Sequence, residues 1–166
     1  MMGTLLRGPE QLALSVEITV YKGEARQFAI KPDVIANANS DDIPSPTGIE
    51  VRHDHESIPY GLNRVLWGEG SWVEAVTSNA YESIGVQIFG DYTIGWARLL
   101  FDGEEVWRGN TAEIWNEFGR FGGYIEVSGF SPGEHVLRVE SLGFDFHPVT
   151  VAFFGFSQTA GLKIKD

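Results

Sequence analysis

Alternating apolar and polar residues along the second half of the chain predict short β-strands. Ile84, Val86 and Ile88 alternate with small or polar residues, and Ile125 and Val127 do the same. A period of two sends successive side chains to opposite faces of a strand. Because only one of the two faces is apolar, these segments are typical of half-buried strands in antiparallel sheets.

An Asp102-Gly103 pair between two apolar runs predicts a tight hairpin. Both residue types favour the positive φ angles of a type I′ turn. A two-residue loop places Leu99 opposite Val106 and Arg98 opposite Trp107. Leu99 and Val106 are then expected in the core, and Arg98 and Trp107 together on the outside.

The remaining pattern extends this β-rich interpretation over the whole chain. Further strands are predicted at Ser15–Tyr21, Gln27–Ile30, Ile49–His55 and Trp72–Val76. The run Val149–Phe156 is apolar on both faces, which predicts a central strand or a strand with a covered outer side. Prolines, asparagines and aspartates between Lys31 and Gly48 predict a long ordered loop. No window supports an amphipathic helix of useful length.

Three segments carry a resemblance to galactose-binding-like β-sandwich (jelly-roll) domains, a class that includes many carbohydrate-binding modules. They are the strand that ends in Asp102-Gly103, the sequence from Gly129 to Val139 (GFSPGEHVLRV), and the apolar strand Val149–Phe156. The resemblance implies an all-β fold, a two-sheet antiparallel β-sandwich (jelly roll). It also implies that His135 follows a structural turn and lies at the edge of the core, a role that agrees with its sharing a face with apolar neighbours.

Length and charge restrict the possible partners. We expect residues 1–14 to form a terminal arm or linker and residues 15–166 to form a single β-sandwich domain. The 23 acidic and 12 basic residues give a net charge of −11, which disfavours nucleic acid and anionic membranes. No apolar run approaches the roughly 18 residues of a membrane span, so membrane insertion is not expected. The absence of cysteine excludes disulfides and thiolate chemistry.

His53 and His55 are the candidate metal ligands, because two histidines at i and i+2 on one strand can chelate a divalent ion. The pattern superficially resembles the metal site of cupins. Its expected glutamate is missing, however, since Pro59 and Tyr60 occupy that spacing. The galactose-binding-like resemblance implies a structural calcium, but the usual last-strand acid is absent from Val149–Ser157. We therefore expect no cofactor and no stoichiometric transition metal.

The aromatic residues are the candidate ligand-binding groups. Alternation points Trp96, Trp107 and Tyr124 outward, and Trp115 lies in a glycine-rich segment. Aromatic rings stack on the C–H faces of sugars, and nearby arginines donate to hydroxyls. The complete set of candidate binding residues is Trp96, Arg98, Trp107, Trp115, Arg120 and Tyr124. A packing role for the same rings is the alternative.

These observations favour a non-catalytic carbohydrate-binding module that recognises a polysaccharide or oligosaccharide. It is expected to be extracellular, as an accessory domain beside a catalytic domain of a larger protein, although residues 1–14 do not read as a signal peptide. One alternative is a structural or protein-interaction module that docks through the face of Phe154 and Phe156 or through an aromatic loop. Another is a cupin-like metal-dependent enzyme that uses His53 and His55.

Overall fold

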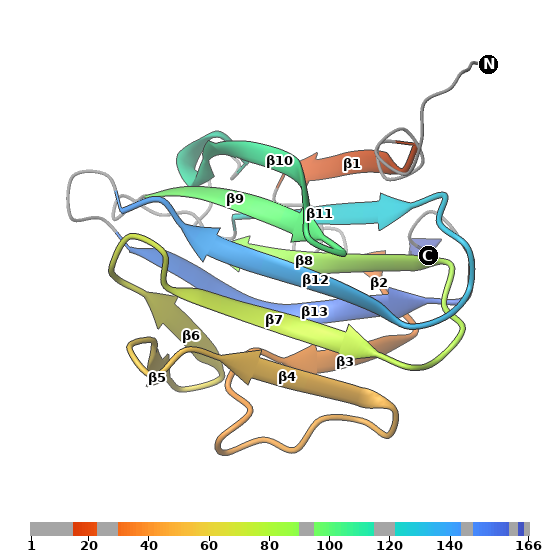
Figure 1. Cartoon of the computed structure of the whole chain (residues 1–166), viewed down its shortest axis with the longest axis horizontal. Helices are drawn as coiled ribbons and strands as arrows, with labels where there is room; N and C mark the ends of the chain where they lie inside the picture. Colours follow the sequence, from red (N-terminus) through yellow and green to blue (C-terminus); the bar gives the residue numbers. More distant parts are fainter. Residues whose placement is uncertain are drawn as a thin grey trace.

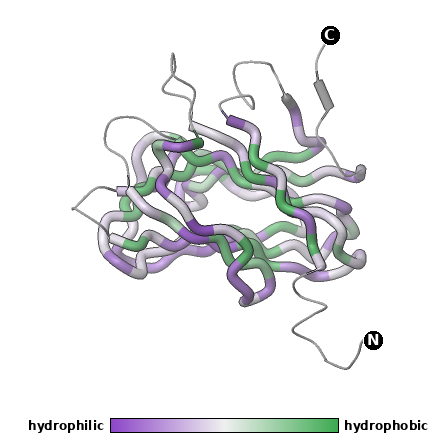
Figure 2. The backbone as a smooth tube through the Cα atoms, turned by 90° about the horizontal axis from the view of Figure 1, so that it is seen from above, coloured by the Kyte–Doolittle hydropathy of each residue, from purple (hydrophilic) through white to green (hydrophobic). Residues whose placement is uncertain are grey.

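The computed structural model describes residues 15–22, 30–89, 95–114, 122–143, 148–159 and 163–164. They form two antiparallel β-sheets that pack face to face (Figure 1), and the two layers are also separate when seen from above (Figure 2). The prediction of an all-β, two-sheet antiparallel sandwich is confirmed. The helical content of these residues is one 3-10 turn, η1 (Thr111–Ile114), and none of their helices is long and apolar enough to cross a membrane.

The five-stranded sheet lies toward the viewer in Figure 1. Its strands, in spatial order, are β10 (Glu104–Asn110), β9 (Trp96–Phe101), β12 (His135–Ser141), β7 (Trp72–Thr77) and β4 (Ile49–His53). Non-consecutive strands are neighbours at β9, β12 and β7, so this sheet brings together side chains that are distant in sequence.

The seven-stranded sheet forms the second layer. In spatial order it contains β1 (Glu17–Lys22), β11 (Gly123–Ser128), β8 (Ser83–Phe89), β13 (Val149–Ser157), β6 (Asn63–Leu66) and β5 (Ile58–Tyr60), with β3 (Val34–Asn37) also paired to β13. A separate pair joins β14 (Lys163–Ile164) to β2 (Ile30–Lys31). One of these strands, β3, lies within the segment 31–48 that was predicted to be a loop, and the short strands β5 and β6 were not predicted.

The core lies between the two sheets. Leu99 and Leu137 of one sheet and Val86, Ile125 and Phe154 of the other are fully buried there. Removing such side chains from water contributes about 1.5–3 kcal/mol each, before the opposing entropy of ordering the chain. The alternation in the sequence thus identified the inward-facing positions of β8, β9, β11 and β12, whereas β13 is apolar on both faces.

The Asp102-Gly103 turn is present, with φ angles of 51° and 88°. Beyond Glu105 a β-bulge shifts the register of the hairpin. Trp107 therefore lies opposite Leu99, and Arg108, not Trp107, lies opposite Arg98. The predicted pairing of Arg98 with Trp107 on the outside is wrong.

Burial of the Trp107 ring explains the bulge. One extra residue on a strand turns the following side chains to the other face. Trp107 consequently packs against the core, whereas Glu105 and Arg108 both face solvent and pair with each other at 2.8 Å. The ring lies over Gly109, where an added Cβ would come within 2.8 Å of it. Trp107 is a packing residue and not an exposed stacking surface.

Tyr124 is only 1% exposed, so its prediction as an exposed binding residue is also wrong. Its side chain is on the outer face of the seven-stranded sheet, as the alternation indicated, but it lies over Gly85 and Gly155. Pro32 contacts the same position of Gly155 and covers this face. Burial, and then the nearby Glu126 charge, raise the pKa of Tyr124 well above its usual value.

Phe154 and Phe156 are both fully buried in the core, and Phe156 packs on Tyr81 with ring centroids 5.3 Å apart. A register shift between Val151 and Phe153 turns Phe153, not Phe154, toward the outer face. The alternative of docking through Phe154 and Phe156 is therefore wrong.

Candidate functional site

Two of the six predicted binding residues share one accessible surface. Trp96 and Arg98 both lie on the outer face of the five-stranded sheet, where Trp96 is 38% exposed. Trp107 faces the core and Tyr124 belongs to the other sheet. Trp115 and Arg120 lie outside the described residues.

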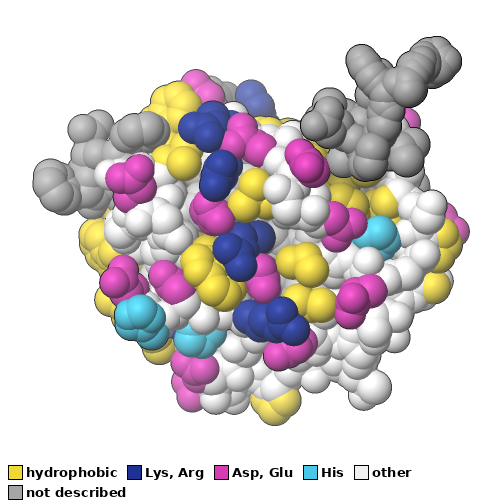
Figure 3. Space-filling view, in the orientation of Figure 1, with side chains coloured by type: hydrophobic (Ala, Val, Ile, Leu, Met, Phe, Trp, Pro, Cys, Tyr) yellow, Lys and Arg dark blue, Asp and Glu magenta, His cyan; other side chains and the backbone are white. Residues whose placement is uncertain are grey.

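A continuous ladder of alternating arginine and glutamate side chains crosses this outer face. It touches all five strands, and its members, in order, are Arg108, Glu105, Arg98, Glu140, Arg138, Glu74, Arg52 and Glu50. Nitrogen-to-oxygen distances between neighbours run from 2.8 to 3.6 Å. Figure 3 shows the basic side chains as a dark-blue row with acidic side chains between them.

The strand register produces this ladder. Arg98 lies directly opposite Glu140, and Arg138 lies directly opposite Glu74. Residues that face each other across an antiparallel pair project from the same face of the sheet. Each single ion pair on a surface contributes only about 0–1 kcal/mol, so its main effect here is to hold the charged groups in a fixed arrangement.

The ladder lowers the pKa of two of its carboxylates. Hydrogen bonding from Arg52 lowers the pKa of Glu50, and hydrogen bonding from Arg108 lowers the pKa of Glu105. The carboxylate of Glu140 correspondingly raises the pKa of Arg98. These groups therefore act as permanent hydrogen-bond acceptors and donors at neutral pH.

A tryptophan that sequence reasoning left out of the candidate site adds to this surface. Trp72 is half-buried on β7, and the guanidinium carbon of Arg138 lies 3.9 Å from the centroid of its ring. A cation over an aromatic face is attracted to the ring and fixes both groups. The face thus carries two indoles, those of Trp72 and Trp96.

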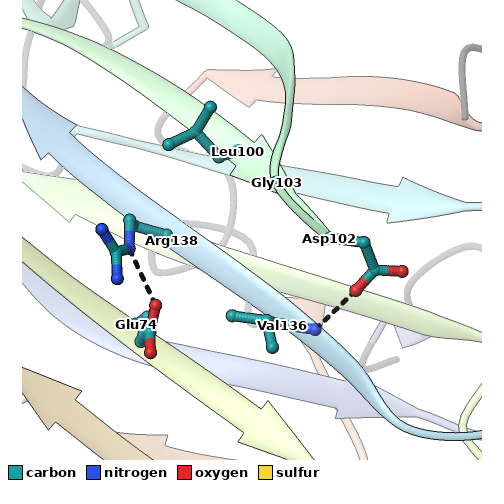
Figure 4. A pocket seen from close by; sticks show the side chains of 6 residues that line it. All are labelled: Glu74, Leu100, Asp102, Gly103, Val136 and Arg138. Atoms are coloured by element: carbon teal, nitrogen blue, oxygen red, sulfur yellow. Dashed lines mark hydrogen bonds and ion pairs between the residues drawn. The ribbon is translucent and has the colours of Figure 1, made fainter. Parts of the chain in front are cut away.

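A hollow of about 550 Å³ lies beside the ladder. Leu100 and Val136 form its apolar floor, and Arg138, Glu74 and the Asp102-Gly103 turn surround them (Figure 4). Asp102 accepts a hydrogen bond from the backbone N–H of Val136 at 2.9 Å, which fixes the turn against β12.

A second hollow of about 320 Å³ continues along the same face toward β4. It is lined by Gly48, Ile49, Glu50, Arg52, Val76, Ser78 and Glu134. Val76 lies directly opposite Val136 in the strand register, so the two hollows lie on adjoining strands. We refer to the two hollows and the bordering ladder as the outer groove.

The outer groove combines an apolar floor with dense, fixed hydrogen-bonding groups. Such a surface suits a molecule with both hydroxyl groups and apolar C–H faces. Four arginines balance four glutamates in the ladder, so its own charge is zero. Asp102 and Glu134 add two acidic groups to the lining of the groove, so the groove matches an uncharged ligand better than an anionic one.

Alternation within single strands is the signal that could have identified several groove residues as outward-facing. Arg138 and Glu140 are separated by two positions on β12, as are Trp72 and Glu74 on β7. The contact between Arg138 and Glu74 could not be predicted from the sequence. The two residues are 64 positions apart and come together only through the pairing of β12 with β7.

The candidate metal ligands His53 and His55 lie in different surroundings. The ring nitrogens of His53 contact the Asp54 carbonyl oxygen at 2.7 Å and the Asp41 carboxylate at 3.1 Å. The side chain of His55 is 93% exposed and lies beyond the end of β4. Within the described ranges, no group of three or more metal-ligating side chains is close enough to hold an ion.

His135 lies at the edge of the core, as expected from the sequence. Its ring stacks on Phe101 with centroids 5.1 Å apart. Its two nitrogens contact the Asp102 carboxylate at 2.7 Å and the Ser131 carbonyl oxygen at 2.6 Å. These contacts connect the hairpin turn to β12 and give His135 a structural role.

Comparison with known proteins finds no matching protein family model and no matching curated protein. Solved structures with a similar arrangement include the CBM36-1 domain of a multidomain xylanase from the hindgut metagenome of Trinervitermes trinervoides. It is 12% identical, with a TM-score of 0.43, over 87% of this chain and 99% of that domain.

Two other solved structures are similar to the chain. One is a carbohydrate-binding module CBM36 in complex with calcium and xylotriose, at 14% identity and a TM-score of 0.40, covering 75% of this chain and 99% of that one. The other is a family two carbohydrate esterase from Cellvibrio japonicus, at 14% identity and a TM-score of 0.45 over 90% of this chain. The chain spans only 36% of the length of that esterase.

Proposed function

We propose that this protein is a non-catalytic carbohydrate-binding module that holds an uncharged oligosaccharide or polysaccharide segment in the outer groove. The observation that carries the proposal is the fixed arginine-glutamate ladder beside the Trp72 and Trp96 rings and the apolar floor. Sugars present hydroxyls at their edges and C–H groups on their ring faces. The groove offers partners to both.

Preorganisation supports binding by this surface. Each guanidinium of the ladder already has a carboxylate neighbour, so little side-chain entropy is lost when a ligand arrives. Planar guanidinium and carboxylate groups can each engage two neighbouring hydroxyls. The competition with water keeps the affinity moderate, with dissociation constants on the order of micromolar to millimolar.

The state of the carboxylates favours binding over acid-base catalysis. A general acid needs a raised pKa so that it carries a proton near neutral pH. Arg52 and Arg108 have the opposite effect, because they lower the pKa values of Glu50 and Glu105. A role as an accessory domain of a larger extracellular protein, beside a catalytic domain, fits this non-catalytic surface and is part of the proposal.

Affinity gel electrophoresis with neutral polysaccharides tests the proposal. The unchanged protein should be retarded by at least one polysaccharide, and Trp96→Ala should reduce that retardation. Trp67→Ala is the matched control, because Trp67 is an exposed indole, 49% accessible, that lies outside the outer groove. Equal retardation of both variants would exclude the Trp96 side of the groove as the binding surface.

A further inference from the structure

A second surface with ligand-binding features lies on the opposite sheet, at the β5–β6 hairpin (Figure 1). Three apolar side chains are conspicuously exposed there: Tyr60 is 73% accessible, Leu62 is 59% and Ile58 is 50%. Single exposed apolar residues are common, but a group of them on one short hairpin marks an interaction site.

A hollow of about 270 Å³ adjoins the hairpin. Its lining comes from three segments that are distant in sequence, and consists of Asn37, Leu62, Asn63, Phe89, Ala152 and Phe153. None of these lining residues is charged. The volume is just below the roughly 300–1,000 Å³ of pockets for drug-sized ligands, which limits an occupant to about one sugar ring.

Two amide side chains give the hollow its polar groups. Asn63 lies directly opposite Tyr60 in the hairpin, and Asn37 lies directly opposite Phe153. Opposite residues share a face, so each amide lies beside an aromatic ring. Both asparagines are half-buried, and their side-chain amides form no hydrogen bond within the described residues. A half-buried amide without a partner among the described residues is available to bond a ligand.

The hairpin is held in place by a buried arginine. Arg64 is 0% exposed, and its guanidinium donates to the Ser57 hydroxyl at 2.7 Å and to the Asp41 carboxylate at 2.8 Å. Asn39 donates to the carbonyl oxygen of Gly61, at the hairpin tip, at 2.8 Å. Strands of three and four residues are not stable alone, so these contacts set the position of Tyr60 and Leu62.

We propose that the β5–β6 hairpin and its hollow form a second glycan-binding site, which takes one uncharged sugar ring. Tyr60 stacks on the C–H face of the ring, and the amides of Asn37 and Asn63 bond its hydroxyls. Aromatic rings with adjacent amides, and the absence of charge from the lining, favour an uncharged sugar over a charged peptide. This site shares no lining residue with the outer groove, so each can bind or fail to bind independently.

Nuclear magnetic resonance titration with methyl glycosides of neutral hexoses and pentoses tests the second site. Saturable shifts are expected at the backbone amides of Asn37, Asn63 and Phe153 for at least one glycoside. The same shifts should persist in Arg138→Ala, which changes only the outer groove. Tyr60→Ala and Asn63→Ala should each weaken the interaction at least about tenfold, equivalent to 1.4 kcal/mol.

Ile58→Ala is the matched control, because Ile58 is exposed on the same strand but lies opposite Val65, whereas Tyr60 lies opposite the lining residue Asn63. It should leave the titration unchanged, and unchanged amide spectra of the free variants would confirm that they fold. Shifts confined to the outer groove would retain the proposed function and overturn the second site. Protein-concentration-dependent shifts at the hairpin without sugar, and none with sugar, would also overturn it, since they indicate docking of a second copy.

Discussion

Arg138 lies over the ring of Trp72, with its guanidinium carbon 3.9 Å from the ring centroid. The same guanidinium donates to Glu74 at 2.8 Å, so one side chain joins the aromatic part of the outer groove to its polar part. Glu74 is almost completely buried and depends on this contact, with Arg52 as its second partner at 3.6 Å.

Replacing Arg138 should destabilise the fold more than replacing Arg108 does. Arg138→Met leaves the buried Glu74 with one distant partner, which should cost about 1–3 kcal/mol of unfolding free energy. Arg108→Met removes an exposed pair at the sheet edge and should have a much smaller effect. Urea denaturation measures both. The double variant Arg138→Met, Glu74→Gln should recover part of the loss, and no recovery would mean that the pair does not interact.

The bulge after Glu105 predicts opposite behaviour for two tryptophans of one hairpin. Trp107→Ala should lower the free energy of unfolding by about 2–4 kcal/mol, because its ring packs against the core. Trp96→Ala should be close to neutral, because its ring is on the outer face. Equal losses in chemical denaturation would indicate that the hairpin has the regular register and no bulge.

The buried Arg64 should determine the rigidity of the β5–β6 hairpin. Arg64→Met removes the cation from a network that includes Asp41 and Asn39, and should destabilise the fold by about 1–3 kcal/mol, because the buried Asn39 loses a hydrogen-bond donor. Hydrogen exchange should accelerate most between residues 58 and 66. Uniform acceleration across both sheets would show instead that Arg64 supports the whole sandwich and not the hairpin in particular.

Acid should weaken the ladder. The folded protein lowers the pKa values of Glu50 and Glu105 below their usual value of 4.5. A lowered carboxyl pKa adds stability that is present above that usual value and is lost as the pH falls through the lowered pKa. The melting temperature of the unchanged protein should therefore exceed that of Glu105→Gln at pH 7. The difference should shrink below about pH 4, and a difference that grows in acid would contradict the ladder.

The sequence predicted the fold because alternation is a local signal. Ile84, Val86, Leu99 and Ile125 each face the core as their strands indicated. The turn chemistry of Asp102 and Gly103 likewise depends on two adjacent residues, and both have the expected positive φ angles. Features that a few neighbouring residues determine were therefore predictable.

The residues of the candidate site were less predictable, because a single bulge or register shift turns the side chains that follow it to the opposite face of the sheet. One bulge turned Trp107 from the outer face to the core, and the register shift before Phe153 buried Phe154. Tyr124 occupies the predicted face, but Pro32 from another segment covers that face. No pattern within one strand contains this information.

The strand order and the β5–β6 hairpin could not be predicted for two other reasons. Only the pairing of β12 with β7 places Arg138 beside Glu74. The β5–β6 hairpin escaped prediction because its strands are three and four residues long and Pro59 interrupts the first. Proline is unfavourable within strands except at a sheet edge, which is the position of β5.

Mapping the contact surface of a bound neutral oligosaccharide by backbone amide shifts tests the central claim most directly. A ligand should first be chosen by its ability to release the protein from an affinity gel. The proposal predicts that the largest shifts fall on Leu100, Val136 and Arg138, together with the neighbouring positions of β7 and β4, and that Arg138→Ala weakens binding at least about tenfold. If these positions do not shift at saturating ligand, and Arg138→Ala binds as tightly as the unchanged protein, the outer groove is not the carbohydrate site.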